Sequence, residues 1–238
     1  MNVQQCFLRT RHFVQSRLSP DGLFGMYFTV GAVTLVGAAW LFGGISEDLV
    51  SGDPLVRVDA IISQCFEHRA LPRFALVANI ASAFGSTATI SVVSVIFAAA
   101  LLWQRQWYWL LSFALAGGGG IVLNIGLKHL FDRKRPEWAD SFATLADPGF
   151  PSGHAMMATI LYGVIAIYLM LRMTSWPGQS LVAVIAAVIV LFVALSRMYL
   201  GAHYMSDVVA GMAAGIAWVA FCLTAIEALK RHRNGSTA

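Results

Sequence analysis

The sequence predicts an all-α, polytopic membrane protein with about six transmembrane helices. Of its 238 residues, 58% are hydrophobic and only 12% are charged, and the mean hydropathy is +0.70. A soluble domain carries about 25% charged residues, and a single core in a chain of this length cannot hide so much apolar surface. Because one spanning helix needs about 20 apolar residues, the chain has room for about six spans with short loops.

Apolar runs give the positions of the spans, at about 24–45, 86–103, 107–130, 154–171, 180–196 and 207–228. The first run is longer than the apolar core of a signal peptide, which has about 7–15 residues, so we expect an uncleaved span. The polar stretch 46–70 is predicted to be a loop, with room for a helix at the membrane interface. Residues 71–84 are predicted to be a membrane-associated segment that ends at the Gly85-Ser86 break.

An even number of spans puts both termini on the same side of the membrane. The 16 Lys and Arg residues divide evenly between the two sides. The flank of the first span usually dominates orientation, and here it contains Arg9, Arg11 and Arg17. We therefore expect one membrane domain over 1–238, with a cytoplasmic flank at 1–22 and a cytoplasmic tail at 229–238.

Residues of reactive types gather in the connections on the opposite side. They follow span three, precede span four and lie between spans five and six: Lys128, Arg135, Ser152, Gly153, His154, Arg197, His203 and Asp207. Spans three and five end on the face where spans four and six begin. The three segments are therefore predicted to converge into an active site at one membrane face.

The cationic residues of this set predict a phosphate site. Arg matches phosphate oxygens with a planar fork, whereas Lys supplies a compact charge, and Lys128, Arg135 and Arg197 provide both. If span three stays helical to its end, Lys128 and Arg135 lie two turns apart on one face. Pro136 would then end that helix.

The start of span four adds an anion site. Ser152 is predicted to cap the helix, and the free N–H groups of the first turn, together with the helix dipole, attract a negative group. Gly153 lets an oxyanion approach the backbone closely. The neighbouring Arg133 and Lys134 are expected to face solvent. Such a set of donors suits a phosphoryl centre with charge on its equatorial oxygens.

Two histidines supply the remaining chemistry. His203 and Asp207 are four positions apart, on one face of a helix start, where an Asp can fix the imidazole tautomer and leave the other ring nitrogen as a nucleophile. His154 can then protonate the leaving oxygen as a general acid. Histidine suits both roles because its pKa lies near neutral pH.

Together, Lys128-x6-Arg135-Pro136, Pro151-Ser152-Gly153-His154 and Ser196-Arg197-x5-His203-x3-Asp207 resemble the three-part signature of the type 2 phosphatidic acid phosphatase superfamily. The resemblance implies a phosphohistidine on His203, with Asp207 as its partner and His154 as the general acid. It also implies that the phosphate is bound by Lys128, Arg135, Ser152, Gly153 and Arg197. No metal and no other cofactor is expected.

The resulting hypothesis is dephosphorylation of a membrane lipid phosphate or diphosphate at the extracytoplasmic face of a bacterial inner membrane. Undecaprenyl diphosphate, phosphatidylglycerophosphate, phosphatidate and a lipid A phosphate all remain candidates. The expected partners are the lipid substrate and the bilayer, with no nucleic acid, and the sequence sets no oligomeric state. Two alternatives stay open. One is a lipid-to-lipid phosphotransferase that uses the same site, and the other is an anion transporter, although its charges would lie at one end rather than at the midplane.

Overall fold

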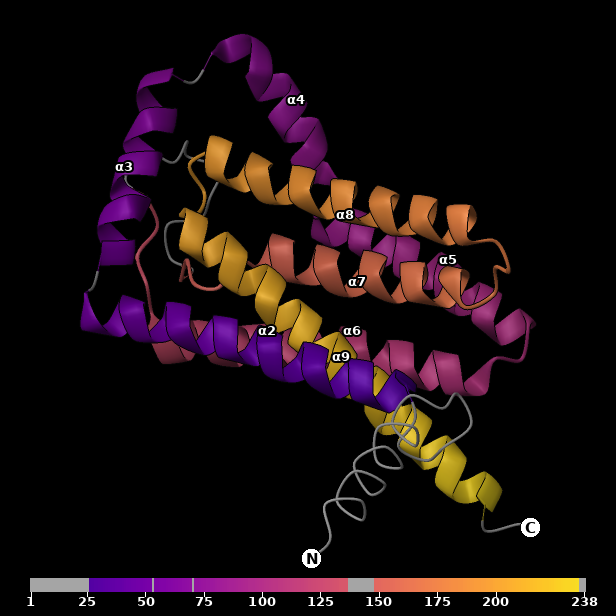
Figure 1. The fold of residues 1–238 in the computed structure, drawn as a ribbon. Coiled ribbons are helices and arrows are strands. Elements are labelled where there is room, and N and C mark those ends of the chain that lie inside the picture. Colours follow the sequence, from indigo (N-terminus) through magenta and orange to yellow (C-terminus); the bar gives the residue numbers. More distant parts are fainter. Residues whose placement is uncertain (1–25, 53, 70, 137–147, 236–238) are drawn as a thin grey trace, which may run out of the picture.

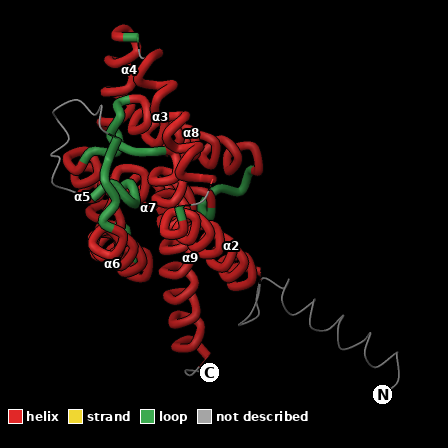
Figure 2. Tube along the Cα trace, turned by 90° about the vertical axis from the view of Figure 1, so that its left-hand side faces the viewer, coloured by secondary structure: helices red, strands yellow, loops and turns green. Residues whose placement is uncertain are grey.

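A computed structural model of the protein describes residues 26–52, 54–69, 71–136 and 148–235. In this part of the chain all regular secondary structure is helical (Figures 1 and 2). The helices are α2 (Met26–Ser51), α3 (Pro54–Arg69), α4 (Pro72–Ala83), α5 (Thr87–Trp103), α6 (Trp107–Phe131), α7 (Gly153–Met170), α8 (Trp176–Tyr199) and α9 (Met205–Gly235). The all-α prediction is confirmed. The flank 1–22 and the last residues of the tail lie outside the described residues.

Six helical segments of the described chain are long and apolar enough to cross a membrane. They are Phe28–Ser51, Arg73–Trp103, Trp107–Phe131, Gly153–Met170, Trp176–Tyr199 and Met205–Lys230. The six predicted spans are therefore confirmed, with a difference in the second, which takes in both α4 and α5. The break between these two helices falls where it was predicted, because Ser86 caps α5 by accepting a hydrogen bond from the N–H of Thr89 at 3.3 Å.

The polar stretch 46–70 differs from the prediction of a loop. The helix α2 continues to Ser51, and α3 begins at Pro54, a residue that suits the first turn of a helix because its missing N–H is not needed there. In Figure 1, α3 stands across the left-hand end of the bundle, where α8 is joined to α9, and Figure 2 looks onto this end. One helix outside the spans therefore borders the end of the bundle that carries the candidate site.

The start of α7 is held against α9 by two glycines. A Cβ atom on Gly211 would lie 2.6 Å from the backbone oxygen of Ser152, and one on Gly215 would lie 3.0 Å from the backbone oxygen of Met156. Small residues four positions apart allow such a close approach of helices in a membrane. This packing fixes the Ser152-Gly153-His154 segment relative to the first turns of α9, and so fixes the second motif relative to the third.

Candidate active site

The first motif is divided between a helix and a loop. The helix α6 ends where Asp132 turns into the left-handed conformation, with φ 39° and ψ 41°, which Asp tolerates better than most residues. The prediction that Lys128 and Arg135 share one helical face is therefore wrong, because only Lys128 lies in α6. Arg135 follows in a segment without regular secondary structure, where its Nη1 donates to the backbone oxygen of Ala202 at 3.2 Å. That bond holds Arg135 beside the third motif.

The second motif forms the start of α7. Ser152 occupies the predicted cap position, but its side chain makes no capping hydrogen bond. Its backbone N–H donates to the backbone oxygen of Asp207 at 2.9 Å. The Oγ of Ser152 is buried, and among the described residues it has no hydrogen-bond partner. Because a buried hydroxyl is costly without a partner, this oxygen is suited to a ligand in the site.

Gly153 is required by packing as well as by the helix start. A Cβ atom at this position would lie 3.1 Å from Oδ1 of Asn124, a buried side chain of α6. A side chain at this position would crowd Asn124 of α6, the helix that also carries Lys128. The glycine therefore keeps the first two motifs close together.

The third motif places a buried histidine beside a buried carboxylate. His203 lies in the turn between α8 and α9, before the helix that was predicted to include it, and its backbone N–H donates to the backbone oxygen of Arg197 at 3.2 Å. Asp207 lies in the first turn of α9 and is fully buried. His203 Nδ1 is 3.6 Å from Asp207 Oδ2, slightly longer than a hydrogen bond. The predicted pairing of these side chains is thus present, with the other ring nitrogen, Nε2, on the far side of the imidazole.

Burial, more than any neighbouring charge, sets the charge state of His203. Burial lowers the pKa of His203 below its usual value of 6.5, Asp207 opposes this shift, and Arg135 and Arg197 lower it further. The imidazole is therefore neutral at physiological pH. Arg197 is itself oriented by α4, because its Nη1 donates to Ser82 Oγ at 2.8 Å.

The remaining predicted residues converge on the same place. His154, in the first turn of α7, lies within electrostatic range of four other residues of the set: Arg197, His203, Arg135 and Lys128. The structure thus brings the residues of all three motifs to one end of the helical bundle. Their individual roles in binding and catalysis stay predictions.

The prediction that Arg133 faces solvent is wrong. Its Nη1 donates to Asp207 Oδ1 at 2.6 Å, and its Nη2 donates to Asp59 Oδ2 at 2.8 Å. Burial alone would lower the pKa of Arg133, but the two carboxylates outweigh it and raise this pKa above its usual value. Asp59 comes from α3 and is only 1% exposed. Sequence reasoning missed it because the surrounding stretch carries many other charged residues.

Comparisons with known proteins agree with this arrangement. Residues 107–231 match the PAP2 superfamily. The chain is 32% identical over 150 residues to phosphatidylglycerophosphatase B of Bacillus subtilis, which covers 63% of this chain and 73% of that protein. It is 34% identical over 140 residues to decaprenylphosphoryl-5-phosphoribose phosphatase of Mycobacterium tuberculosis, covering 56% of this chain and 70% of that protein.

Solved structures show the same fold. A crystal structure of a transmembrane PAP2-type phosphatidylglycerolphosphate phosphatase from Bacillus subtilis superposes with a TM-score of 0.72 at 27% identity, over 82% of this chain and 96% of that chain. The LpxE structure from Aquifex aeolicus superposes with a TM-score of 0.54 at 21% identity, over 69% of this chain and 93% of that chain. At that identity the second likeness concerns the fold alone.

The six apolar helices and the gathered motifs define an integral-membrane phosphatase. More particularly, the chain belongs to the PAP2 superfamily and to its lipid phosphatases. The resemblance drawn from the three motifs is confirmed. The alternative of an anion transporter is not supported, because the named relatives are enzymes.

Proposed function

We propose that this chain removes a terminal phosphate from a membrane lipid through a phosphohistidine on His203, without a metal ion. The observation that carries the proposal is the buried His203–Asp207 pair, 3.6 Å apart, at the end of the bundle where Arg135, Arg197 and the Ser152 hydroxyl also gather. A neutral imidazole beside several cationic donors is suited to attack on a phosphate, whose negative charge those donors offset.

The reaction proceeds in two steps. In the first, the lone pair of His203 Nε2 forms a bond to phosphorus, and the bond between phosphorus and the lipid oxygen breaks. That oxygen keeps the electron pair and takes a proton from His154. In the second, water attacks the phosphohistidine and gives a proton to His154, and the electrons of the P–N bond return to His203.

Asp207 stabilises the positive charge that develops on the His203 ring as the P–N bond forms. The charge on the phosphoryl oxygens is assigned to Lys128, Arg135 and Arg197, to Ser152 Oγ and to the N–H groups at the start of α7. These groups supply the charge neutralisation that other phosphoryl-transfer sites obtain from Mg²⁺.

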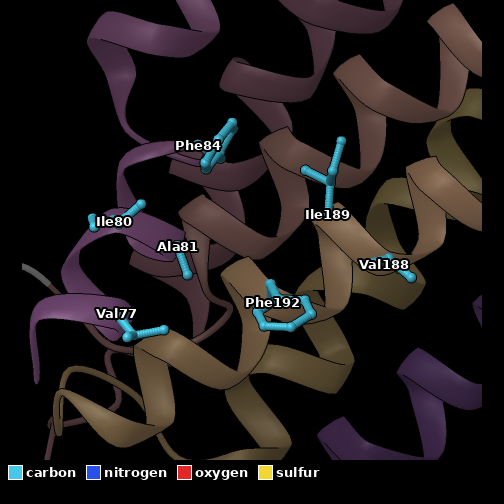
Figure 3. Close-up of a pocket in the computed structure, with 7 residues that line it drawn as sticks. All are labelled: Val77, Ile80, Ala81, Phe84, Val188, Ile189 and Phe192. Atoms are coloured by element: carbon cyan, nitrogen blue, oxygen red, sulfur yellow. The ribbon is translucent and has the colours of Figure 1, made fainter. Parts of the chain in front are cut away.

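An apolar groove beside the site supports a lipid as the substrate. It has a volume of about 280 Å³ and lies between α4 and α8, lined by Val77, Ile80, Ala81, Phe84, Val188, Ile189 and Phe192 (Figure 3). The next residue after Ala81 is Ser82, which accepts the hydrogen bond from Arg197. An acyl or prenyl chain in this groove would therefore bring its headgroup close to a phosphate-binding arginine.

The names of the two relatives indicate which candidate substrates should be tested first. One is named for phosphatidylglycerophosphate and the other for a decaprenyl-linked phosphoribose. Both are phosphate monoesters on a long apolar carrier. Phosphatidylglycerophosphate and polyprenyl phosphates are therefore the first substrates to test, ahead of phosphatidate and a lipid A phosphate.

Purified full-length protein in detergent should release inorganic phosphate from this lipid panel in the presence of EDTA. Vanadate should inhibit, because it takes up the five-coordinate geometry of the phosphoryl transition state. Product analysis by thin-layer chromatography separates transfer to water from transfer to a second lipid. Strict dependence on added Mg²⁺ would contradict the metal-independent mechanism, and activity on soluble phosphate esters alone would contradict the lipid substrate.

We further propose that residues 1–238 form one membrane domain whose active site faces away from the cytoplasm. The basic flank of the first span supports this orientation. Reporter fusions placed after Ala238 and within 140–148 are expected to report the cytoplasmic and extracytoplasmic sides, respectively. An extracytoplasmic signal at Ala238 would reverse the orientation and move the chemistry inside the cell.

The acid side of the pH–rate profile should reflect the lowered pKa of His203. Protonation removes the Nε2 lone pair, so kcat/KM falls with decreasing pH only below the usual imidazole value of 6.5. An activated aryl phosphate isolates this step because its leaving group needs no proton. The titration of the substrate itself is measured by ³¹P NMR and divided out. If kcat/KM, corrected for the titration of the substrate, already falls at pH values above 6.5, the burial of a neutral His203 is contradicted.

A further inference from the structure

Arg133 lies at the centre of a buried ionic cluster in which only Asp207 is a specified residue of the three motifs. Its side chain is 10% exposed, and those of its partners Asp59 and Asp207 are 1% and 0% exposed. The guanidinium also lies over the ring of Tyr204, with 4.4 Å from Cζ to the ring centroid. One cation therefore bridges two buried carboxylates, one from α3 and one from α9.

Asp59 ties α3 to the first turn of α9. Its Oδ1 accepts from the backbone N–H of Ser206 at 3.0 Å, and its Oδ2 accepts a short hydrogen bond from the Ser206 hydroxyl. The same hydroxyl accepts from Arg133 Nη1 at 2.6 Å. A carboxylate at a helix N-terminus is favoured by the helix dipole, so Asp59 orders the turn that carries Asp207.

The Asp207 carboxylate is held on two sides. Its Oδ1 accepts from Arg133, and its Oδ2 accepts from the backbone N–H of Tyr204 at 2.8 Å. The second oxygen is also the one that faces His203 Nδ1. The orientation of the carboxylate toward the imidazole is therefore set by groups outside the phosphate site.

We propose that Arg133 and Asp59 are positioning residues for the reaction, which hold the Asp207 carboxylate aimed at His203. The inference rests on the proposed function, because it assigns a role to groups that act through the proposed nucleophile. Arg133 is not a phosphate ligand, since its Nη1 is occupied by Asp207 and Ser206 and its Nη2 donates to Asp59.

The charges in the cluster explain why both residues are needed. Two carboxylates and one guanidinium leave a net charge of −1 beside His203, which offsets the positive charge that the ring gains on attack. Without Arg133, two buried carboxylates would lack a counter-charge, which is strongly unfavourable. Without the charge of Asp59, Arg133 would neutralise Asp207 alone and leave less negative charge for the imidazolium.

The two residues therefore act in opposite directions on the protonation of His203. Several elements contribute the charged or titratable groups around His203 and Asp207, either directly or through Arg133 and His154: Asp59, Lys128, Arg133, Arg135, His154, Arg197 and Tyr204. Removing the positive charge of Arg133 favours protonated His203. This moves the acid limb of the pH–rate profile, where kcat/KM falls with decreasing pH, to higher pH. Removing the negative charge of Asp59 disfavours it, which moves the limb to lower pH.

The experiment compares Arg133→Gln and the nearly isosteric Asp59→Asn with Lys134→Gln, a matched charge removal at an exposed neighbour. For Arg133→Gln we expect kcat to fall by about 10–100-fold, as when a group that orients a metal-binding histidine is removed, with KM little changed. The acid limb should move up in Arg133→Gln and down in Asp59→Asn. Lys134→Gln should match the wild type in all three quantities.

Chemical rescue separates positioning from folding. Added guanidinium should restore part of the kcat of Arg133→Ala and should leave Lys134→Ala unaffected. The inference is overturned if the two acid limbs move in the same direction or stay in place, or if Arg133→Gln raises KM while kcat is kept. Failure of the proposed function looks different, because His203→Ala would then retain turnover or the wild type would release no phosphate from any lipid.

Discussion

Replacing His203 with alanine is expected to abolish turnover and phosphoenzyme formation together. The variant has no nitrogen to attack phosphorus, and the surrounding cations can only assist a direct attack by water. Removal of a catalytic nucleophile in comparable enzymes costs about 10⁴-fold or more in kcat. The measurement is phosphate release from the best lipid of the panel, with quenched samples assayed for protein-bound ³²P.

A matched control is His129→Ala, which removes an exposed imidazole from the same end of α6. This variant should keep the activity of the wild type. Asp207→Asn should still bind lipid but form phosphoenzyme slowly, because the amide cannot stabilise the charged ring. If His203→Ala continues to trap phosphate, another residue is the nucleophile.

Replacing His154 with alanine should give a loss that depends on the leaving group. A lipid alkoxide is a poor leaving group, so removal of the general acid should cost about 10²–10⁴-fold. An activated aryl phosphate needs no proton, and the first-turnover burst of aryl alcohol should recover much of the wild-type rate. Rapid-mixing kinetics with the two substrates give the ratio directly.

Other outcomes would contradict or change the role of His154 as the general acid. If the lipid and the aryl substrate lose the same factor in the first turnover, His154 does not act as a general acid. If neither substrate is affected, His154 has only a packing role at the start of α7. A defect in His154→Ala that appears only after the burst would assign it to the hydrolysis of the intermediate.

The spans and the site were largely predictable because each depends on local patterns. Apolar runs fix the spans, and three short motifs place the reactive residues at span ends. The end of α6 was not predictable in this way. The segment after Lys128 lacks a glycine, yet Asp132 turns left-handed, and the side chains of Arg133 and Arg135 reach Asp207 and Ala202. Tertiary contacts there outweigh the tendency of the helix to continue.

Asp59 was also beyond the reach of sequence patterns. It lies 74 positions before Arg133 in the chain, and nothing in the periodicity of 46–70 separates it from the other charged residues there. Its importance comes from burial against the first turn of α9, which is a property of the folded chain. The helix α3 itself was within reach, because Pro54 marks a helix start.

In the proposed mechanism, phosphate passes through His203. The most direct test uses His154→Ala with a ³²P-labelled aryl phosphate, since the first step then needs no acid and the hydrolysis step lacks its base. We expect label to accumulate on the protein, to be lost in acid, and to be assigned to His203 by peptide mapping with mass spectrometry. Label on a carboxylate or on any other side chain, or phosphate release with no protein-bound label, would contradict a phosphohistidine on His203.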